Sequence, residues 1–438
     1  TAKDLWPFLR VLHVLSLDLH TSTRQTEAHI KTLLALKMTD SDPAASADAA
    51  WDALLTFASK VGPAARSLKR ADLPAALVQA YGEVNAHEQR ILTTLKDHTE
   101  LVLQKIRTTI GPAFHLRRAG IVHKVLAAIE AKQVVLITGP AGGGKSVIGK
   151  EAVTFLSREF FTFGFRVEEF AVAHIDETLH NSQIPARATE LQAILGAQGR
   201  KVLVIESVER LLEKPTRDGF SDLMTLAQSD NGLSILMTCR DYSVEQVKAS
   251  FLQPAGIDPA VVKVPPLDDA ELKEIETAFP SLAVPLAKPV LREILRNPYF
   301  IDKALQIPWD AGRPLPENER DFRALFWRQI VRADQNPAYG MPRRREEALQ
   351  ELAVRRARAL SDYVPATELD AAAITLLKQD SLVVSPGTNA LLVATAHDVL
   401  EDWAILQWIE EQHLTDETSF NALSSAVGPH PAVRRSYR

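Results

Sequence analysis

The stretch KQVVLITGPAGGGKS, residues 132–146, decides the fold of this chain. Residues 132–139 are an apolar run of the kind that forms a buried strand, and residues 145–159 are compatible with a helix. Between them, GPAGGGKS (139–146) matches the pattern G-x-x-x-x-G-K-[ST], in which a glycine-rich loop turns its backbone N–H groups toward a polyphosphate. The sequence therefore predicts a phosphate-binding loop, or P-loop, at the turn between a strand and a helix.

The residue types in this loop suit a nucleoside triphosphate with Mg²⁺. Lys145 offers a mobile positive charge to the β- and γ-phosphates, and the Ser146 hydroxyl can ligate Mg²⁺. The N-terminus of the following helix adds a partial positive charge. The alternative, a glycine-rich turn without a ligand, leaves the order of strand, loop and helix unexplained. The loop residues expected to contact the nucleotide are Gly139, Pro140, Ala141, Gly142, Gly143, Gly144, Lys145, Ser146 and Val147.

Further strands are predicted on the C-terminal side of this loop. Apolar runs occur at 165–175, 201–207, 233–240 and 261–266, and helical segments separate them. Strands that alternate with helices are typical of a parallel sheet covered on both faces.

An acidic residue ends the run KVLVIES at 201–207. Glu206 follows four apolar residues, and an acid at this place can hold Mg²⁺ or its water shell, so Ser146 and Glu206 are the predicted metal ligands. Glu209 lies three residues farther on and is a candidate to orient or deprotonate the attacking water. The alternative is that Glu209 and Arg210 form only a solvated ion pair beyond the strand.

The run LSILMTCR at 233–240 ends on a second polar candidate. Strand C-termini in a parallel sheet point toward the ligand crevice, so Arg240 is a candidate sensor of the γ-phosphate, with a surface salt bridge as the alternative. Cys239 has no evident histidine partner and is expected to be a small buried residue rather than a nucleophile. The predicted catalytic residues are Lys145, Glu206, Glu209 and Arg240.

Composition limits the class of protein. The 438 residues exceed one ordinary core, so two to four domains are expected. With 46% hydrophobic and 24% charged residues the chain is of the folded type, and its net charge of −5 gives no general attraction to nucleic acid or an anionic membrane. One cysteine allows no internal disulfide, and no apolar run approaches the roughly 20 residues that span a bilayer. We expect a cytoplasmic protein without a membrane partner, in which this region does not bind nucleic acid directly.

The segments around the predicted sheet are mainly helical. Residues 1–110 contain one strand-like run at 11–19 and then helical patterns, which indicates a helical connector, and residues 111–265 hold the P-loop domain. Residues 266–318 form a helical domain with joints at prolines 280, 289 and 298.

The last segment, residues 319–438, indicates a winged-helix domain. A helix predicted at 366–378 leads to two apolar runs within 382–395, which flank the turn sequence PGTN at 386–389. Because the chain starts with Thr1 and stops inside a basic run, we expect more sequence at both ends.

Five segments of the chain, in order, resemble the bacterial STAND NTPases, the signal-transducing P-loop ATPases that include the NACHT and NB-ARC groups. The segments are GPAGGGKS, VLVIESVERL, ILMTCRDY, LRNPYFIDKAL and ATAHDVLEDWAIL, and the similarity spans residues 111–410. A P-loop alone occurs in many families, whereas the five segments in this order are much more specific. The resemblance implies an α/β P-loop NTPase domain with a parallel sheet, then a helical domain and a winged-helix domain, after a mainly α N-terminal connector.

The resemblance also implies roles for single residues. Glu206 stands at the Walker B position, where the family usually has Asp, and Arg240 stands at the sensor position. Pro298 matches the helical-domain proline near the adenine, and Arg117 belongs to the segment that lines the base. His397, in the pair His-Asp, matches the winged-helix histidine that contacts the β-phosphate of ADP and holds the closed state. The alternative for His397 is a satisfied polar residue beside a hairpin.

A switch is the function that the resemblance implies. STAND proteins stay closed with ADP and exchange it for ATP when a trigger is sensed, after which they form homo-oligomers that cluster an effector. The implied cofactors are ATP or ADP with Mg²⁺, and the implied trigger is a phage protein in antiviral defence, within bacterial innate immunity. The effector would precede this region and a sensor domain would follow it. Glu206-Ser207 in place of an acidic pair, with Arg210 where a second acid is frequent, implies slow or switch-like hydrolysis.

Two other functions stay open at this point. A transcription regulator would use the winged helix on DNA, although LDAAAITLLKQDSLVV (369–384) has Lys378 as its only basic side chain. A continuous remodelling motor of the AAA+ kind needs fast turnover, which the altered acidic pair disfavours. The sequence does not distinguish ATP from GTP by chemistry, and it does not reveal the trigger, the effector, the oligomer number or the resting nucleotide.

Overall fold

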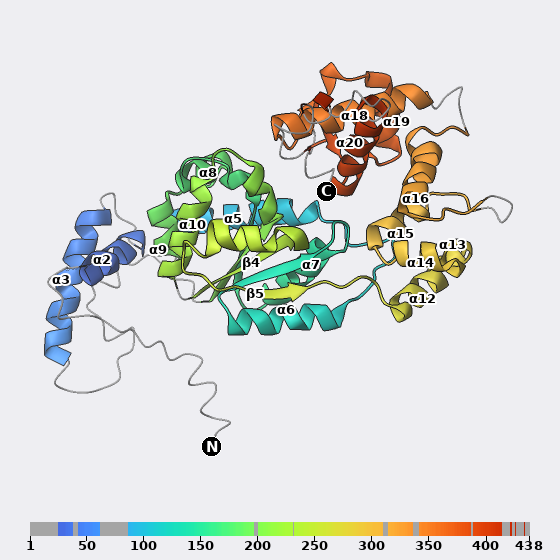
Figure 1. Cartoon of the computed structure of the whole chain (residues 1–438). Helices are drawn as coiled ribbons and strands as arrows, with labels where there is room; N and C mark the ends of the chain where they lie inside the picture. The colour runs from blue at the N-terminus through green and yellow to red at the C-terminus, as the bar shows by residue number, and fades with distance from the viewer. Residues whose placement is uncertain are drawn as a thin grey trace. The chain divides into compact units, whose positions relative to one another are not determined.

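The computed structural model describes residues 25–37, 43–61, 86–196, 200–230, 232–309, 314–335, 341–386 and 389–413, with residues 421, 422, 425 and 433. The chain divides into two compact units (Figure 1). The smaller comprises Thr1–Asp97 and Leu179–Lys201, and the larger comprises His98–Thr178 and Val202–Arg438. The strand-like run expected at 11–19 lies outside the described residues.

The smaller unit is helical where it is described, as the helical patterns of the connector predict. It contains α2 (Gln25–Lys37), α3 (Pro43–Val61), the start of α5 (Ala86–Gln104) and α9 (Ala188–Gly196). The small core between α2 and α3 is formed by Leu34, Ala47 and Ala50. Proline opens α3 because a first helical residue needs no backbone N–H donor.

A five-stranded sheet is the centre of the larger unit, with the strand order β2-β3-β4-β1-β5. β1 pairs in parallel with β4 and with β5. The α/β fold with a parallel sheet is therefore confirmed. The strands are β1 (Val134–Gly139), β2 (Phe161–Arg166), β3 (Lys201–Glu206), β4 (Leu233–Arg240) and β5 (Ala260–Lys263).

The central strand β1 is buried on both of its faces. Val135 and Ile137 pack with residues of α6 (Ala119–Ala131) and α7 (Lys145–Leu156) in one core cluster. Val134 and Leu136 point to the other face, since side chains alternate along a strand, and both are fully buried. This double burial explains why the run at 132–139 is apolar throughout rather than alternating.

The strand predicted at 165–175 is wrong for most of its length. β2 ends at Arg166, and the chain continues as the 3₁₀ turn η3 (Val167–Phe170) and then α8 (Ile175–Asn181). The Glu169 carboxylate accepts a hydrogen bond from the backbone N–H of Arg166 at 2.9 Å, which closes a capping box at the start of the turn. This local cap diverts the backbone, and the strand instead uses the preceding apolar residues.

Short helical elements connect the remaining strands of the sheet. After β3 come the 3₁₀ turn η4 (Val208–Glu213) and α10 (Asp218–Ser229). After β4 come η5 (Asp241–Ser243), α11 (Val244–Val247) and the wide helical turn η6 (Lys248–Leu252).

Residues after β5 form the helical segment predicted for 266–318, and its joints are at the expected prolines. η7 (Pro280–Leu282), α14 (Pro289–Ile294) and α15 (Pro298–Ala304) each begin with proline. The other helices are α12 (Asp269–Ala278) and α13 (Ala283–Ala287).

The C-terminal segment contains helices and a three-stranded antiparallel sheet of order β6-β8-β7. The hairpin expected within 382–395 is present as β7 and β8, although residues 387 and 388 of its turn lie outside the described residues. The four-part domain division stays a prediction. The elements are α16 (Glu319–Phe326), the wide turn η8 (Trp327–Val331), α18 (Pro342–Ala359), β6 (Val364–Pro365), η9 (Ala366–Glu368), α19 (Ala371–Gln379), β7 (Val383–Val384), β8 (Leu392–Thr395) and α20 (Asp398–His413).

Aromatic packing fixes α20 against α15 and α16. The ring of Trp403 lies 5.3 Å from that of Phe300 on α15 and 5.6 Å from that of Phe326 on α16, measured between centroids. Large buried aromatic rings contribute much of the packing energy of a core, so this contact sets the direction in which the first turn of α20 faces.

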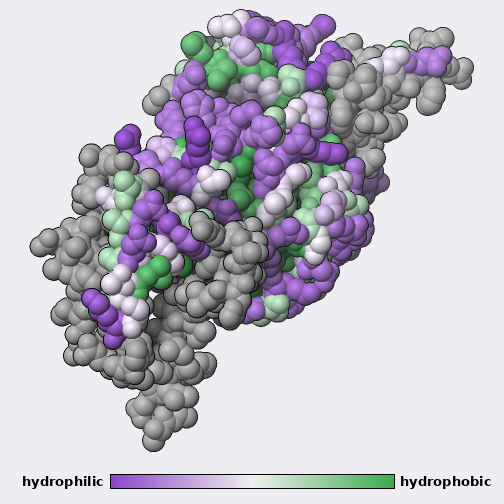
Figure 2. Space-filling model, turned by 90° about the vertical axis from the view of Figure 1, so that its left-hand side faces the viewer, coloured by the Kyte–Doolittle hydropathy of each residue, from purple (hydrophilic) through white to green (hydrophobic). Residues whose placement is uncertain are grey.

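Among the coloured residues on the face that Figure 2 shows, most are hydrophilic, and the hydrophobic ones form small separate areas. Among the described helices, none combines the length and the low polarity that crossing a bilayer requires.

Candidate functional site

The predicted P-loop lies at the C-terminal end of β1 and leads into α7. Gly142 and Gly144 have φ angles of +75° and +91°, a backbone region that favours glycine. Gly144 directly precedes the first residue of α7, so the free N–H groups of this helix open toward the loop. Residues 139–147 thus occupy the strand–loop–helix turn that the motif requires.

Lys145 is folded back onto the loop. Its ammonium group donates hydrogen bonds to the carbonyl oxygens of Gly139 (3.1 Å) and Pro140 (2.8 Å). Burial lowers the pKa of Lys145, while the negative charges of Glu209 and Glu206 act in the opposite direction. Neutral carbonyls compensate a buried ammonium group only in part, so a phosphate at this place would be a better partner.

Glu206 and Ser146 meet at the end of β3. The Thr238 hydroxyl on the neighbouring strand donates to one Glu206 carboxylate oxygen at 3.2 Å. Burial raises the pKa of Glu206, and the nearby hydroxyl groups of Ser146 and Thr238 oppose this effect. The other carboxylate oxygen, Oε1, is buried and has no hydrogen-bond partner among the described residues.

This orphaned carboxylate oxygen beside a serine hydroxyl suits Mg²⁺, which prefers hard oxygen ligands and keeps several of its waters. The described residues contain no group of three or more His, Cys, Asp or Glu side chains that could hold a metal ion by themselves. A Mg²⁺ ion bound here would therefore complete its shell with phosphate oxygens and water. Glu206 and Ser146 are the residues that would hold it.

Glu209 is brought back to the site by a sharp turn after β3. Ser207 has left-handed backbone angles (φ 58°, ψ 52°), and its N–H donates to the Thr238 hydroxyl at 2.8 Å. Glu209 follows in η4, is 7% exposed, and lies 3.5 Å from the Arg240 guanidinium. Because Glu209 is buried and directed toward Arg240, the alternative of a solvated pair with Arg210 is wrong.

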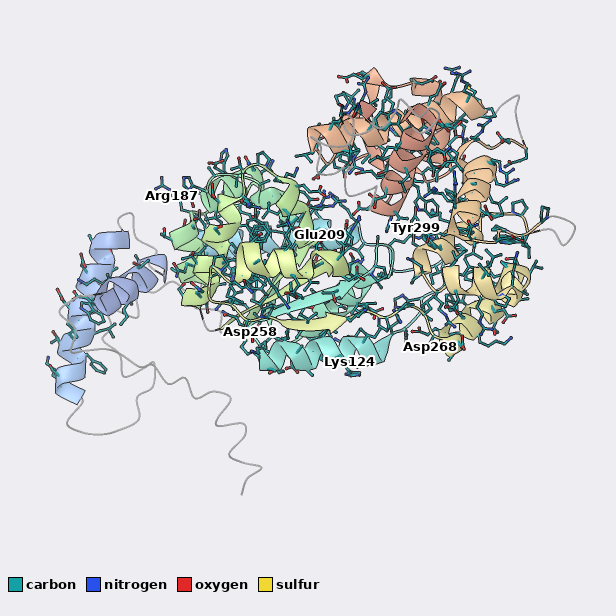
Figure 3. All side chains as sticks on the ribbon, viewed as in Figure 1. Lys124, Arg187, Glu209, Asp258, Asp268 and Tyr299 are labelled. Carbon is teal, nitrogen blue, oxygen red and sulfur yellow. The ribbon has the colours of Figure 1, made fainter. Side chains whose placement is uncertain are left out.

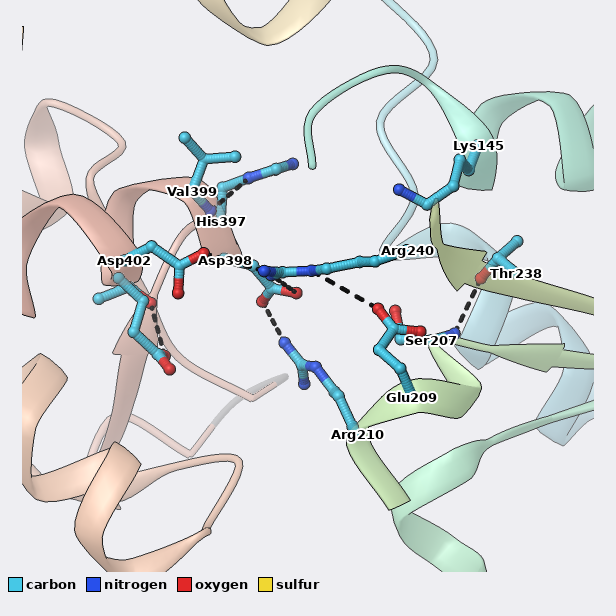
Figure 4. A network of polar contacts seen from close by, with 12 residues as sticks. Lys145, Ser207, Glu209, Arg210, Thr238, Arg240, His397, Asp398, Val399 and Asp402 are labelled. Carbon is cyan, nitrogen blue, oxygen red and sulfur yellow. Dashed lines mark hydrogen bonds and ion pairs between the residues drawn. The ribbon is translucent and has the colours of Figure 1, made fainter. Parts of the chain in front are cut away.

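Arg240 is at the centre of a buried network of charges (Figure 4). It ends β4 directly opposite Gly139, the first residue of the P-loop, and is 5% exposed. Its guanidinium donates to Asp402 at 3.1 Å and lies 3.7 Å from Asp398, both on α20. Burial lowers the pKa of Arg240, but the carboxylates of Asp402 and Asp398 more than reverse this effect. Arg240 thus forms salt bridges, as the alternative expects, but at a buried place rather than on the surface, and its role as a sensor stays a prediction.

Arg210 adds a second cation to this network. It bonds to Glu168 in η3 at 2.5 Å and to Asp398 on α20. Burial raises the pKa of Glu168, but Arg210 and Arg166 more than offset this effect, so the pKa is lowered. Two arginines from the sheet region thus bind the first turn of α20.

His397 directly precedes α20. Its Nδ1 atom accepts a hydrogen bond from the backbone N–H of Val399 at 3.1 Å, and its ring stacks on that of Tyr299 with 4.2 Å between centroids. Burial lowers the pKa of His397 to about 4, so the ring is neutral near pH 7. With Nδ1 accepting, Nε2 carries the proton and can donate to an anion. In Figure 4 the His397 ring and the Lys145 ammonium group lie on the same side of Arg240.

Residues on both sides of Pro298 contact the P-loop, and sequence reasoning missed them. The Asn297 side chain donates to the carbonyl oxygen of Ala141 at 2.8 Å, and the N–H of Tyr299 (labelled in Figure 3) donates to the carbonyl oxygen of Gly142 at 3.3 Å. The available signal was Asn-Pro, since Asn caps a helix that Pro opens.

Two other candidates lie in different surroundings. Arg117 is exposed, whereas the next residue, Arg118, is buried and pairs with Glu271 at 2.7 Å. The role of Arg117 near the base stays a prediction. Cys239 is fully buried, as expected, and burial raises the pKa of its thiol, which keeps it protonated and unreactive.

No protein-family model matches the sequence, and no curated protein is significantly similar to it. Among solved structures, the chain is similar to the Walker-type ATPase PABY2304 of Pyrococcus abyssi (TM-score 0.35, 15% identity, 69% of this chain and 99% of that one). It is also similar to PH0952 of Pyrococcus horikoshii, a STAND protein with a tetratricopeptide repeat sensor (TM-score 0.42, 10% identity, 75% of this chain and 48% of that one). A third is the ORC2 protein of Aeropyrum pernix in its ADPNP–ADP complexes (TM-score 0.34, 14% identity, 72% and 98%). At these values the likeness concerns the fold, and the chemistry must be argued from the residues of the site.

Proposed function

We propose that this chain is the nucleotide-binding core of a STAND-type ATPase, a switch that binds ADP or ATP with Mg²⁺. The observation that carries the proposal is the pairing of Arg240, opposite the P-loop, with Asp402 and Asp398 on α20. The predicted phosphate site and the C-terminal segment therefore share one buried network of charges. A change of nucleotide at the loop alters the electrostatic balance of this network directly.

In the proposed site, each residue binds one part of the nucleotide or its metal ion. The amides of the P-loop and the Lys145 ammonium group bind the β-phosphate, and the neutral Nε2–H of His397 donates to the same group. Ser146 and Glu206 hold Mg²⁺, which supplies charge neutralisation between the phosphates when it is bound. Arg240 meets the γ-phosphate of ATP.

The network supports slow hydrolysis rather than rapid turnover. Glu209, the candidate for orienting water, lies 3.5 Å from Arg240, and this cation is itself held by Asp402. With its carboxylate paired to this guanidinium, Glu209 must leave Arg240 before it can orient the attacking water. Turnover would then follow a rearrangement of α20, as in a switch between two states whose populations the nucleotide shifts.

The larger biological role rests on the resemblance of the five ordered segments. We place this core between an N-terminal effector and a C-terminal sensor, in a protein that forms homo-oligomers when the sensor binds a phage protein. The two states then differ in whether α20 is held by the arginines of the sheet region. Assembly requires ATP because only the triphosphate offers Arg240 a new partner.

The charges of α18 argue against the alternative function of a DNA-binding regulator. Five of its arginines pair with carboxylates, and such paired cations attract phosphate backbones poorly. The pairs are Arg343–Glu347, Arg344–Asp370, Arg345–Asp380, Arg355–Glu351 and Arg356–Glu401.

Calorimetry with Lys145→Ala tests the proposal. We expect the wild-type chain to bind ADP and a non-hydrolysable ATP analogue in the presence of Mg²⁺, and Lys145→Ala to weaken both by about 100-fold or more. Lys132→Ala is the matched control, because this lysine is half-exposed and pairs with Asp258 instead of the loop carbonyls. Absence of heat for both nucleotides on folded wild-type protein would refute the proposal.

A further inference from the structure

Three carboxylates surround the buried guanidinium of Arg240. The distances are 3.1 Å to Asp402, 3.5 Å to Glu209 and 3.7 Å to Asp398. Asp398 is shared with Arg210, which it also bonds. Because Arg240 is only 5% exposed, water screens these interactions weakly.

A diphosphate and a triphosphate differ in whether they need Arg240 as a binding partner. A diphosphate uses the loop amides and Lys145 and can leave Arg240 with its carboxylates. The additional phosphate of a triphosphate lies beyond the β-phosphate, toward the strand ends where Arg240 is placed opposite Gly139. It would bring further negative charge to a place that already has three carboxylates. Favourable binding then requires that Arg240 leave Asp402.

Asp402 is the carboxylate best suited to hold Arg240. It makes the shortest contact, at 3.1 Å, and it is less exposed than Asp398 (15% compared with 29%). Glu209 is more buried, at 7%, but its carboxylate is farther from the guanidinium, at 3.5 Å. Asp402 lies one helical turn after Asp398 on α20, so both face the same side of the helix. The neighbouring residue, Trp403, is buried among Phe300, Phe322 and Phe326, which keeps this turn in place.

We infer that Asp402 determines nucleotide preference: by holding Arg240, it makes the site select nucleoside diphosphates over triphosphates. The inference rests on the proposed function, because it presumes that the P-loop binds nucleotides. The carboxylate acts by competition, since it occupies the cation that the third phosphate needs. It is thus a specificity residue that touches no part of a bound diphosphate.

Asp402→Asn tests this inference on the full chain. The dissociation constants of ADP and of adenosine 5′-(β,γ-imido)triphosphate are measured by calorimetry with Mg²⁺, and the ratio of the two is compared between proteins. We expect Asp402→Asn to shift the ratio about tenfold toward the triphosphate, within the usual range of coupling between sites. Asp402→Glu keeps the charge and should keep a ratio close to that of the wild type.

Asp380→Asn is the matched control. Asp380 also pairs with a buried arginine, Arg345 at 2.5 Å, but takes no part in the network around Arg240. In Asp380→Asn, the ratio of the dissociation constants of the diphosphate and the triphosphate should equal that of the wild type. The inference is overturned if folded Asp402→Asn keeps the wild-type ratio, or if Asp380→Asn shifts it equally. These outcomes are distinct from failure of the proposed function, in which the wild-type protein binds neither nucleotide.

Discussion

At the scale of single residues, one hydroxyl group positions both acids of the candidate site. Thr238 is 1% exposed, donates to Glu206 and accepts from the N–H of Ser207. The first bond engages Oε2 of Glu206, whereas Oε1 is buried and has no hydrogen-bond partner among the described residues. The second stabilises the left-handed turn at Ser207 that returns Glu209 to the site, although this backbone conformation is costly for a residue other than glycine.

We therefore expect Thr238→Val to reduce ATP turnover about tenfold or more while nucleotide affinity changes little, because misplaced catalytic groups affect the rate more than binding. Thr238→Ser keeps the hydroxyl and should restore turnover. Single-turnover phosphate release and calorimetry measure the two quantities. The control is Thr178→Val, another buried threonine whose hydroxyl bonds to the carbonyl oxygen of Glu169 at 2.8 Å. Equal turnover in the Val and Ser variants at position 238 would contradict the positioning role.

At the scale of elements, sequence reasoning succeeded where one local pattern was sufficient. The runs that form β1, β3 and β4 are predictable because these strands are buried along almost their whole length and are mostly apolar. β5 is mostly not buried, so only its short apolar run indicates it. The prolines indicate helix starts because a helix tolerates proline only in its first turn. The strand prediction for 165–175 failed for two reasons. Glu169 forms a local cap that ends the strand, and Glu168 pairs with Arg210, which is far away in sequence.

The contact between the P-loop and the start of α15 gives a prediction at this scale. A Cβ atom on Gly142 would lie 2.6 Å from Cβ of Tyr299 and 2.8 Å from Oδ1 of Asn297, in a backbone conformation that itself disfavours alanine by about 1–2 kcal/mol. Gly142→Ala should therefore push α15 away from the loop, lower the melting temperature and weaken ADP binding at least about tenfold.

Gly120→Ala provides the comparison for this variant. Gly120 lies in the first turn of α6, and an added Cβ would meet no heavy atom within 4 Å. Alanine there should stabilise the protein by up to about 1 kcal/mol. Thermal unfolding and calorimetry on both variants decide the matter, and a Gly142→Ala protein that behaves like Gly120→Ala would show that the loop and α15 are not in close contact.

At the scale of the whole molecule, the candidate site combines residues that sequence reasoning found with residues it missed. Lys145, Ser146 and the loop glycines follow from one contiguous motif. Asn297 contacts Ala141 of the loop across 156 positions, and Asp402 contacts Arg240 across 162 positions, so only tertiary packing brings them to the site. No spacing rule connects such residues in a single sequence. The same packing is what allows a nucleotide to influence the C-terminal segment.

A substitution of Arg210 tests the coupling between the nucleotide site and the C-terminal segment. It bonds to Glu168 and to Asp398, so Arg210→Gln would leave two carboxylates in the network without this cation. Removing one member of a buried ion pair costs about 3–5 kcal/mol. We expect the start of α20 to separate from η4, with faster amide hydrogen exchange at residues 398–402 and assembly that no longer requires a trigger.

The matched variant for Arg210→Gln is Arg323→Gln. Arg323 pairs with Glu410 at 3.0 Å, so it ties the far end of the same helix to α16 rather than to the sheet region. Its loss should speed exchange near residue 410 only, and should leave the oligomeric state unchanged. Mass photometry with ATP and exchange measured by mass spectrometry separate the two variants. If Arg210→Gln stays monomeric and residues 398–402 remain as protected as in the wild type, the two arginines do not restrain α20, and the network around Asp398 is only a static part of the core.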